Sequence, residues 1–196
     1  MNFKLPSDDI LSSKAGYVLC MTDSESQRRE VAGLVDRMYS WRGYKCGSTT
    51  SVGADRTQTV FQVRRGEDLV ATLTLRMDSE AGLLAEGLYR DEVALFRGMG
   101  GTLCELTGLA VAPGEDSPEV LRSLFQAAYM VGHRRFGASD VFIEVNPRHV
   151  SYYRRIGFRS VGTMRICPRV AAPAILMHLE LDDWEQETLL KQRIAA

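Results

Sequence analysis

The chain has 196 residues, 45% of them hydrophobic, 25% charged and 8% aromatic, and these fractions exclude disordered and fibrous proteins. A chain of this length can fold as one domain with a sizeable core. No run of apolar residues is long enough to span a membrane, and the polar N-terminus lacks a secretory signal core. The four cysteines have no CxxC spacing, so we expect free thiols, no metal site and a cytoplasmic location.

Charge is distributed unevenly along the chain, although the formal net charge is only −1. Residues 133–169 hold eight arginines against two acidic residues, a local charge of +6 that leaves −7 for the rest. Such an excess favours a phosphate-bearing ligand or an acidic partner, and a solvated arginine-rich face is the alternative. Nucleic acid fits less well, because no aromatic residues interleave with the basic ones in a known reading motif.

A strand and a helix open the predicted fold. Residues 1–16 are polar and irregular, so we expect a tail that precedes a single domain over 17–196. The apolar run 17–21 predicts a buried strand. Ser24 and Gln27 form a capping-box pattern, which predicts that a helix begins there. The apolar face of this helix follows the spacing i, i+3, i+4, i+7: Val31, Leu34, Val35 and Met38.

The middle of the chain predicts a loop, a hairpin and a short helical stretch. Turn residues fill 45–57, and a loop of this length is often functional. The runs 58–64 and 68–76 are rich in β-forming residues around a tight turn, which predicts the two strands of a hairpin. Leucines and other apolar residues in 78–101 predict one or two short helices.

A strand–helix–strand unit follows, with strands expected over 102–111 and 140–145. Ser117 and Pro118 mark the start of its helix, an N-cap followed by proline at the first helical position. Gly137 is suited to the C-terminal end of that helix. Such a crossover usually joins parallel strands with a right-handed connection.

The end of the chain predicts a short helix over 146–157, strands over 158–166 and 174–181, and a polar helix after 183. The second strand alternates clearly between apolar and other residues. Because strands and helices alternate without a repeat or a low-complexity linker, the fold class is α/β.

One motif in this framework resembles a known family. Asn146-Pro147 is followed by Tyr153 seven residues after the asparagine, and then by Gly157-Phe158. This spacing resembles the N-P-x-x-x-x-x-Y-x-x-x-G-F segment of GCN5-related N-acetyltransferases (GNAT). The resemblance implies a mixed, mostly antiparallel sheet with helices on both faces. It also implies that this helix lies beside the thiol end of a pantetheine arm.

Further segments resemble one group within that superfamily, the N-acyl amino acid synthases, which are related to acyl-homoserine lactone synthases. The resemblance implies transfer of a medium or long fatty acyl chain from acyl carrier protein, or coenzyme A, to the α-amine of an amino acid. No cofactor would be bound permanently, since the donor is a co-substrate. The segments are RMYSWRGY (37–44), TLTLR (72–76), CELTGLAV (104–111), VNPRH with YYRRIGF (145–158) and CPRVAAPAILMHLEL (167–181).

Two departures from the family patterns bear on the substrates. The GNAT pyrophosphate loop is glycine-rich, whereas 111–118 holds one glycine and the acids Glu115 and Asp116. These acids would repel a diphosphate, which favours a carrier protein over coenzyme A as donor. Gly108 stands where the lactone-forming relatives have arginine, which argues against lactone formation.

Acyl transfer from a thioester to an amine needs a base and a group that protonates the leaving thiolate. Glu105 is the candidate base, directly or through water, because its apolar neighbours should favour proton uptake; the alternative is a carboxylate paired with Arg76. Tyr153 is the candidate acid, and its alternative is packing. Thr107 lies on the same strand face as Glu105 and either binds substrate or fills a β-position.

The remaining candidates divide between acceptor and donor. Arg37 and Arg76 are candidates for the acceptor's carboxylate, although a solvated helix position is the alternative for Arg37. Trp41 and Tyr44 would line a pocket or lie in the core. On the donor side the candidate contacts to phosphopantetheine are Asn146, Arg148, His149 and Val111. Asn146 can also cap its helix, and a surface helix position is the alternative for His149.

The arginine-rich segment supplies the expected docking face for acyl carrier protein. Its candidate residues are Arg134, Arg135, Arg148, Arg154 and Arg155. Cys104 is expected to be a small core residue rather than a nucleophile, since no histidine is placed to activate it. Two other functions stay open: a small-molecule N-acetyltransferase that uses acetyl coenzyme A, and a non-catalytic sensor of the same fold that binds an acyl carrier or an amine.

Overall fold

The structure is a computed structural model that describes residues 10–14, 16–45 and 57–182. It divides into two compact units. The first unit comprises residues 1–76 and 106–130, and the second comprises 77–105 and 131–196. Within the described residues, no helix has both the length and the apolar character needed to cross a membrane.

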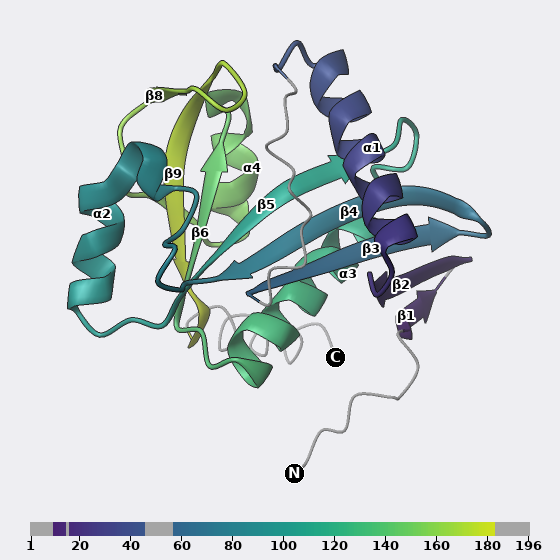
Figure 1. Cartoon of the computed structure of the whole chain (residues 1–196), viewed down its shortest axis with the longest axis horizontal. Helices are drawn as coiled ribbons and strands as arrows, with labels where there is room; N and C mark the ends of the chain where they lie inside the picture. The colour runs from purple at the N-terminus through teal and green to yellow at the C-terminus, as the bar shows by residue number, and fades with distance from the viewer. Residues whose placement is uncertain (1–9, 15, 46–56, 183–196) are drawn as a thin grey trace. The chain divides into compact units, whose positions relative to one another are not determined.

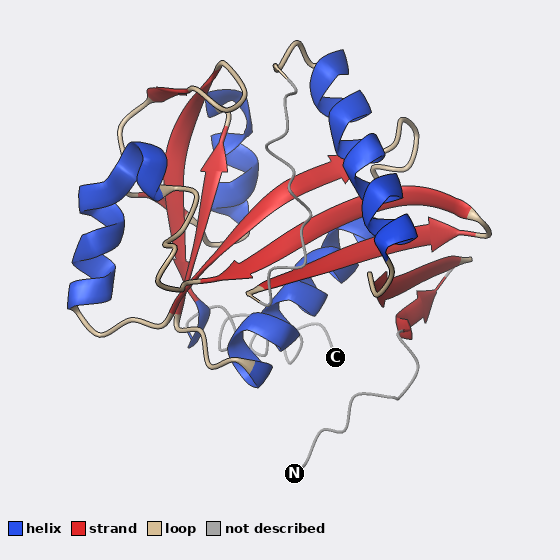
Figure 2. Cartoon of the chain, viewed as in Figure 1, coloured by secondary structure: helices blue, strands red, loops and turns tan. Residues whose placement is uncertain are grey.

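Antiparallel strands in chain order form the sheet of the first unit (Figures 1 and 2). They are β1 (Ile10–Lys14), β2 (Tyr17–Met21), β3 (Gln58–Arg65) and β4 (Asp68–Met77), and next to β4 comes β5 (Leu103–Val111). The predicted hairpin is confirmed, with Gln62 opposite Thr72 and Val60 opposite Thr74. The predicted loop over 45–57 lies almost entirely outside the described residues.

The strand β1 corrects the expectation that residues 1–16 are irregular. Its backbone pairs with β2 in antiparallel register, Lys14 opposite Tyr17 and Ser13 opposite Val18. An edge strand is held by backbone hydrogen bonds, so the segment needs no apolar alternation to join the sheet. The prediction of one domain over 17–196 stays a prediction.

Two capped helices cover the sheet of the first unit. The helix α1 (Glu25–Trp41) begins where the capping pattern predicted, because the Ser24 hydroxyl accepts a hydrogen bond from the Gln27 amide. The helix α3 (Pro118–Tyr129) begins likewise at Ser117, whose hydroxyl accepts from the Val120 amide. Figure 1 shows α1 in front of the strands and α3 behind them. The predicted apolar face of α1 is buried: Val31, Leu34, Val35 and Met38.

In the second unit the central strand is β9 (Ala172–Glu180), which lies antiparallel to three others. They are β6 (Asp140–Val145), β7 (Arg159–Ser160) and β8 (Arg165–Cys167). The order in this unit is β5-β6-β9-β7, with β8 also paired to β9. The helices are α2 (Glu86–Gly98), the π-helix η1 (Met130–Arg135), the 3₁₀-helix η2 (Pro147–His149) and α4 (Val150–Arg155).

The strand predicted over 158–166 is wrong, since the chain forms two short strands, β7 and β8, with a break between them. At the break a Cβ atom on Gly162 would lie 2.6 Å from the Tyr89 ring. The amides of Val161 and Gly162 both donate to the carbonyl of Leu176, at 3.0 and 3.3 Å. A ring that fills this space leaves no room for regular pairing with side chains, so the strand is interrupted there.

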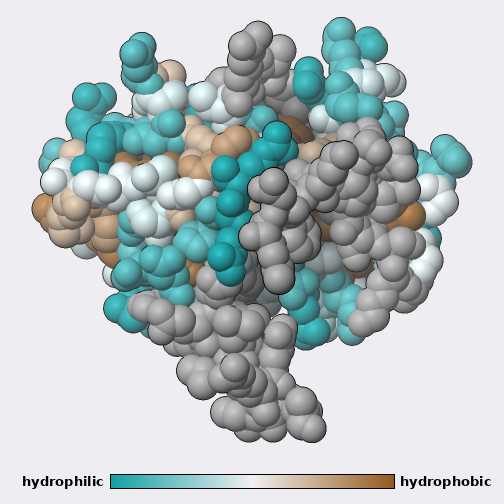
Figure 3. Space-filling view, turned by 90° about the horizontal axis from the view of Figure 1, so that it is seen from below, coloured by the Kyte–Doolittle hydropathy of each residue, from teal (hydrophilic) through white to brown (hydrophobic). Residues whose placement is uncertain are grey.

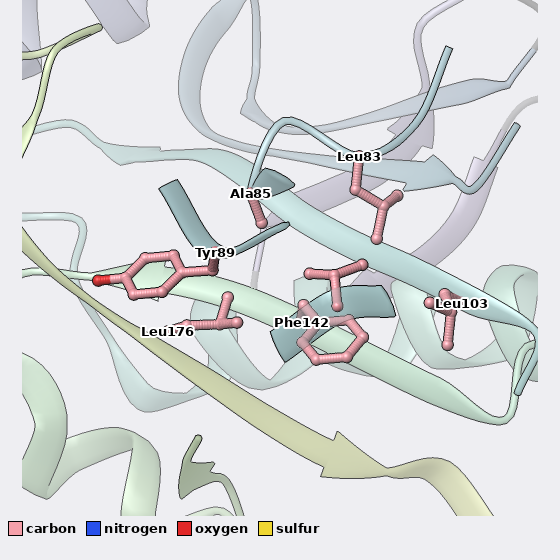
Figure 4. Close-up of a cluster of buried hydrophobic side chains, with 7 residues drawn as sticks. Leu83, Ala85, Tyr89, Leu103, Phe142 and Leu176 are labelled. Atoms are coloured by element: carbon pink, nitrogen blue, oxygen red, sulfur yellow. The ribbon is translucent and has the colours of Figure 1, made fainter. Parts of the chain in front are cut away.

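Tyr89 is the centre of the apolar cluster in this unit. Figure 4 shows its ring with the neighbouring side chains, and its hydroxyl donates to the Ala174 carbonyl at 2.7 Å. Thr163 offers a second carbonyl at 3.0 Å. Burial raises the pKa of the phenol above its usual value. The other buried members of the cluster are Leu83, Ala85, Val93, Leu103, Phe142 and Leu176.

A hydrogen bond between His178 and Asp140 joins the end of β9 to the start of β6. The His178 ring nitrogen Nε2 lies 2.6 Å from a carboxylate oxygen of Asp140, and the His178 ring packs against Phe96 at 4.2 Å between centroids. Burial acts to raise the pKa of Asp140, but hydrogen bonds from His178 and Ser139 outweigh it and hold that pKa below its usual range.

On the face shown in Figure 3, hydrophilic residues cover much of the described surface, with apolar residues between them.

We expect Tyr89→Phe to destabilise the chain by about 1–3 kcal/mol, because the buried carbonyl of Ala174 loses its hydroxyl donor. Urea unfolding measures the change, and Tyr44→Phe is the control, since the Tyr44 ring is only half-buried beside Tyr39. Equal unfolding midpoints for Tyr89→Phe and the unmodified chain would contradict this account.

Candidate active site

Glu105 lies in β5 with only 4% of its surface exposed, and both of its carboxylate oxygens accept backbone hydrogen bonds. The amide of Leu84 donates to Oε1 at 2.7 Å, and the amide of Ala85 donates to Oε2 at 3.1 Å. These two residues come directly before α2, so the carboxylate binds the free amides at the start of that helix. The negative charge also lies at the positive end of the helix dipole.

The peptide that Glu105 binds is held on its other side by an ion pair. The Leu84 carbonyl accepts a hydrogen bond from the Arg169 guanidinium at 2.8 Å. The same guanidinium pairs with the carboxylate of Glu144 on β6. The side chains of Arg169 and Glu144 are 25% and 13% exposed. Sequence reasoning missed both residues, because nothing in their spacing relates them to Glu105.

The motif over 146–158 has a clear structural basis. Asn146 caps η2, its side-chain oxygen accepting from the Arg148 amide at 3.2 Å. After α4 the backbone of Gly157 has φ +107, a conformation that favours glycine. The turn brings the Phe158 amide to the Tyr153 carbonyl at 3.1 Å and the two rings edge to face at 5.8 Å. The Tyr153 ring is therefore held by the same turn that the motif encodes.

Six of the eight arginines in the basic segment are exposed. Two belong to η1 and four surround α4: Arg134, Arg135, Arg148, Arg154, Arg155 and Arg159. The other two, Arg165 and Arg169, are half-buried in ion pairs with Glu92 and Glu144. The exposed basic surface therefore contains fewer arginines than the count over residues 133–169 suggested. We call the set Arg148, Arg154, Arg155 and Arg159 the α4 arginine group.

The predicted acceptor residues belong to the first unit. Arg37 is exposed on α1, and Trp41 at the end of that helix is 74% exposed, so a core position for Trp41 is wrong. The half-buried Tyr44 ring meets Tyr39 edge to face at 5.7 Å. Arg76 lies near the end of β4, half-buried and opposite Gln58. Their roles toward an acceptor stay predictions.

Within β5, Thr107 and Val111 are half-buried, and Gly108 between them has φ +63. A Cβ atom on Gly108 would lie 3.4 Å from the Thr74 hydroxyl oxygen, and any other side chain would be strained there. The irregularity begins directly after Thr107, so the strand changes course next to the candidate site residues. A glycine inside a strand pattern is the sequence signal for such a feature.

The loop between β5 and α3 keeps its buried acid in place. The Glu115 carboxylate accepts from the Tyr17 hydroxyl at 2.7 Å and pairs with Arg65. The hydrogen bond to Glu115 raises the pKa of Tyr17. On β5, burial raises the pKa of the Cys104 thiol far above its usual value, which agrees with a core role for that residue.

Comparison with known proteins bears on this arrangement. The family model of the N-acyl amino acid synthase FeeM matches residues 30–180. The solved structure of FeeM, an N-acyl amino acid synthase from uncultured soil microbes, is 26% identical and superimposes with a TM-score of 0.82. The match covers 90% of this chain and 97% of that chain. None of the curated proteins matches the sequence.

More distant structures share the fold. A putative N-acetyltransferase from Lactobacillus plantarum is 16% identical, with a TM-score of 0.61 over 85% of this chain and 99% of that chain. The AHL synthase LasI is 9% identical, with a TM-score of 0.58 over 84% and 90%. The expected GNAT fold, a mixed and mostly antiparallel sheet with helices, is therefore confirmed.

We expect Glu105→Gln to lower the free energy of unfolding by about 1–3 kcal/mol. An amide can accept through only one of its two end atoms, so its NH₂ group would face a backbone N–H donor. Urea unfolding tests this, with Glu80→Gln as the control at an exposed position in the same unit. A Glu105→Gln variant as stable as the control would show that the two amide hydrogen bonds contribute little.

Proposed function

Because the chain belongs to the N-acyl amino acid synthase FeeM family and is an N-acyltransferase, we propose that it transfers a medium or long fatty acyl chain from acyl carrier protein to the α-amine of an amino acid. The observation that carries the proposal is the family match over residues 30–180, which includes Glu105 and the motif with Tyr153. The free thiols of Cys20, Cys104 and Cys167 fit a cytoplasmic location.

The reaction makes one bond and breaks one. The amine nitrogen attacks the thioester carbonyl carbon, a C–N bond forms, and the C–S bond breaks. The amine loses a proton, and the phosphopantetheine thiolate gains one as it leaves. The protein must therefore accept a proton near the amine and supply one near the sulfur.

Glu105 accepts the proton from the amine, directly or through one water molecule. An ionised carboxylate has about four acceptor positions, and the two backbone amides take one on each oxygen. A carboxylate held in this way can take a proton from an ammonium group or a water. Since both oxygens are anchored, the carboxylate keeps one orientation, which is what a positioned base requires.

Tyr153 donates the proton to the leaving thiolate. Its place in the turn from α4 to Phe158 supports this role, because the ring is held edge to face between Tyr152 and Phe158. Asn146, Arg148 and His149 lie in the preceding residues, where they contact the phosphopantetheine arm, and Val111 contributes at the end of β5. The donor is a co-substrate, so no permanently bound cofactor is needed.

Two charge features support a carrier protein as donor rather than coenzyme A. The α4 arginine group offers exposed guanidinium groups to an acidic partner and to one phosphodiester. The loop between β5 and α3 instead keeps Glu115 buried and Asp116 exposed, and these carboxylates disfavour a diphosphate. On the acceptor side, Arg37 and Arg76 bind the amino acid carboxylate, while Thr107, Trp41 and Tyr44 line its pocket.

The deciding experiment is mass spectrometry of organic extracts after the protein is incubated with mixed acyl-carrier thioesters and the twenty amino acids. We expect an N-acyl amino acid that is absent from heat-killed controls. Only an acetylated product from acetyl coenzyme A would replace the proposal with a small-molecule acetyltransferase. Binding of acyl carrier or amine without any product would indicate a sensor.

We expect Tyr153→Phe to lower kcat at least tenfold, about 1.4 kcal/mol of barrier, because the leaving thiolate loses its proton donor. Tyr152→Phe is the matched control, a neighbouring tyrosine on the same helix. Initial rates with saturating donor and acceptor measure the effect. Equal kcat values for Tyr153→Phe and Tyr152→Phe would remove the acid role from Tyr153.

We expect Arg154→Glu with Arg155→Glu to raise KM for the acyl carrier at least tenfold, while KM for an acyl-pantetheine thioester stays within twofold. Charge reversal weakens docking of an acidic protein and leaves the reacting groups in place. Arg122→Glu, an exposed position on α3, is the control. If the unmodified chain, the double variant and the Arg122→Glu control have the same KM for the carrier, the carrier does not dock on the α4 arginine group.

A further inference from the structure

We propose that Arg169 and Glu144 are a positioning pair for Glu105, acting through the peptide bond between Leu84 and Ala85. The inference rests on the proposed function, because it assigns the pair to the reaction that Glu105 serves. It goes beyond that function by adding two residues that touch no reacting atom and control one that does.

One peptide group lies between the pair and the base. Its carbonyl, from Leu84, accepts from the Arg169 guanidinium at 2.8 Å, and its N–H, from Ala85, donates to Glu105 Oε2 at 3.1 Å. A cation on the carbonyl oxygen polarises the peptide and makes its N–H a stronger donor. Glu144, Arg169, the peptide and Glu105 therefore form one continuous chain of hydrogen bonds.

The geometry restricts Glu105 in two ways. The Leu84 amide donates to the other carboxylate oxygen at 2.7 Å. Rotation of the carboxylate would therefore break the hydrogen bonds from both backbone amides. Movement of the segment that carries these amides would break the bond to Arg169. The Leu84 carbonyl also accepts from the Gly87 amide at 3.1 Å, so Arg169 adds a side-chain restraint to the turn that leads into α2. Glu144 in turn holds Arg169 by charge.

The ion pair between Arg169 and Glu144 is poorly explained by a contribution to the stability of the fold alone. The Glu144 atom Oε1 is buried without a hydrogen-bond partner among the described residues. Desolvating a half-buried ion pair that leaves one oxygen unsatisfied costs free energy, and apolar side chains of similar volume often replace ion pairs removed from water without loss of stability. A contribution to positioning the base gives the pair a function that offsets this cost.

A neighbouring pair in the same unit provides a matched comparison. Arg165 also donates to a backbone carbonyl of this segment, that of Leu88, and pairs with Glu92 at 2.5 Å. Its guanidinium lies 4.6 Å from the centre of the Tyr89 ring. The carbonyl that it binds belongs to a peptide whose N–H, from Tyr89, donates to the Ala85 carbonyl inside the helix rather than to Glu105.

The test replaces each pair by apolar residues, Arg169→Met with Glu144→Met and, as control, Arg165→Met with Glu92→Met. We expect the first double variant to unfold at the same temperature as the unmodified chain or higher, with kcat lowered at least tenfold. KM for the donor should stay within twofold. We expect the control to keep kcat within twofold. An unchanged kcat in the first variant, or an equal loss in both, would overturn the proposal.

Conservative single variants separate positioning from packing. Arg169→Lys keeps the positive charge but offers no planar fork to hold carbonyl and carboxylate together, so we expect a kcat between those of the unmodified chain and the double variant. Should the double variant not fold, Arg169→Lys and Glu144→Gln decide: lowered kcat at an unchanged unfolding temperature supports positioning. Full activity in both variants overturns it.

A stability cycle keeps the inference testable even if no acyl transfer is found in the unmodified chain, an outcome that would remove the proposed function. Glu105→Gln, Arg169→Lys and their combination are compared by urea unfolding. The hydrogen-bond chain through the peptide is supported if the change in free energy of unfolding of the double variant differs from the sum of the two single changes. Strictly additive losses would show that Arg169 and Glu105 act independently, and would overturn the inference whatever the reaction.

Discussion

The peptide between Leu84 and Ala85 is the constraint on which the candidate site depends. It is polarised between the Arg169 guanidinium and the Glu105 carboxylate, so its position is set from both sides. The segment before α2 forms turns, in which the Leu84 carbonyl also accepts from the Gly87 amide, and the Glu105 carboxylate satisfies the amides that the turns leave free. Glu105 and the start of α2 are consequently one structural feature of the second unit.

The core beneath α2 explains why this segment stays in place. Tyr89 is fully buried, interrupts regular helix geometry in α2 and donates to the carbonyl of Ala174. Its ring also occupies the space next to Gly162, where the pairing of the chain with β9 is interrupted between β7 and β8. Irregular backbone at these two places thus follows from burying one large aromatic residue whose hydroxyl must be satisfied.

Charge is used in two different ways in the second unit. Exposed arginines around α4 remain in water, where their fields reach an approaching partner and their pairwise energies are small. Arg165 and Arg169 are half-buried, each shared between a carboxylate and a backbone carbonyl. The same residue type is therefore exposed around α4 and half-buried in the ion pairs, and burial separates the two settings.

Local patterns in the sequence determined the elements whose causes are local: the Ser24 and Ser117 caps, the hairpin, and the turn at Gly157-Phe158, each set by residues a few positions apart. Glu105 was recognised as a candidate from its strand and its resemblance, but its hydrogen bonds were not. Only the tertiary structure decided that Glu144 and Arg169 act on Leu84, that residues 10–14 join the sheet edge, and that Tyr89 interrupts a strand. These contacts join segments far apart in the chain, and sequence spacing carries no information about which distant groups a buried charge or ring will meet.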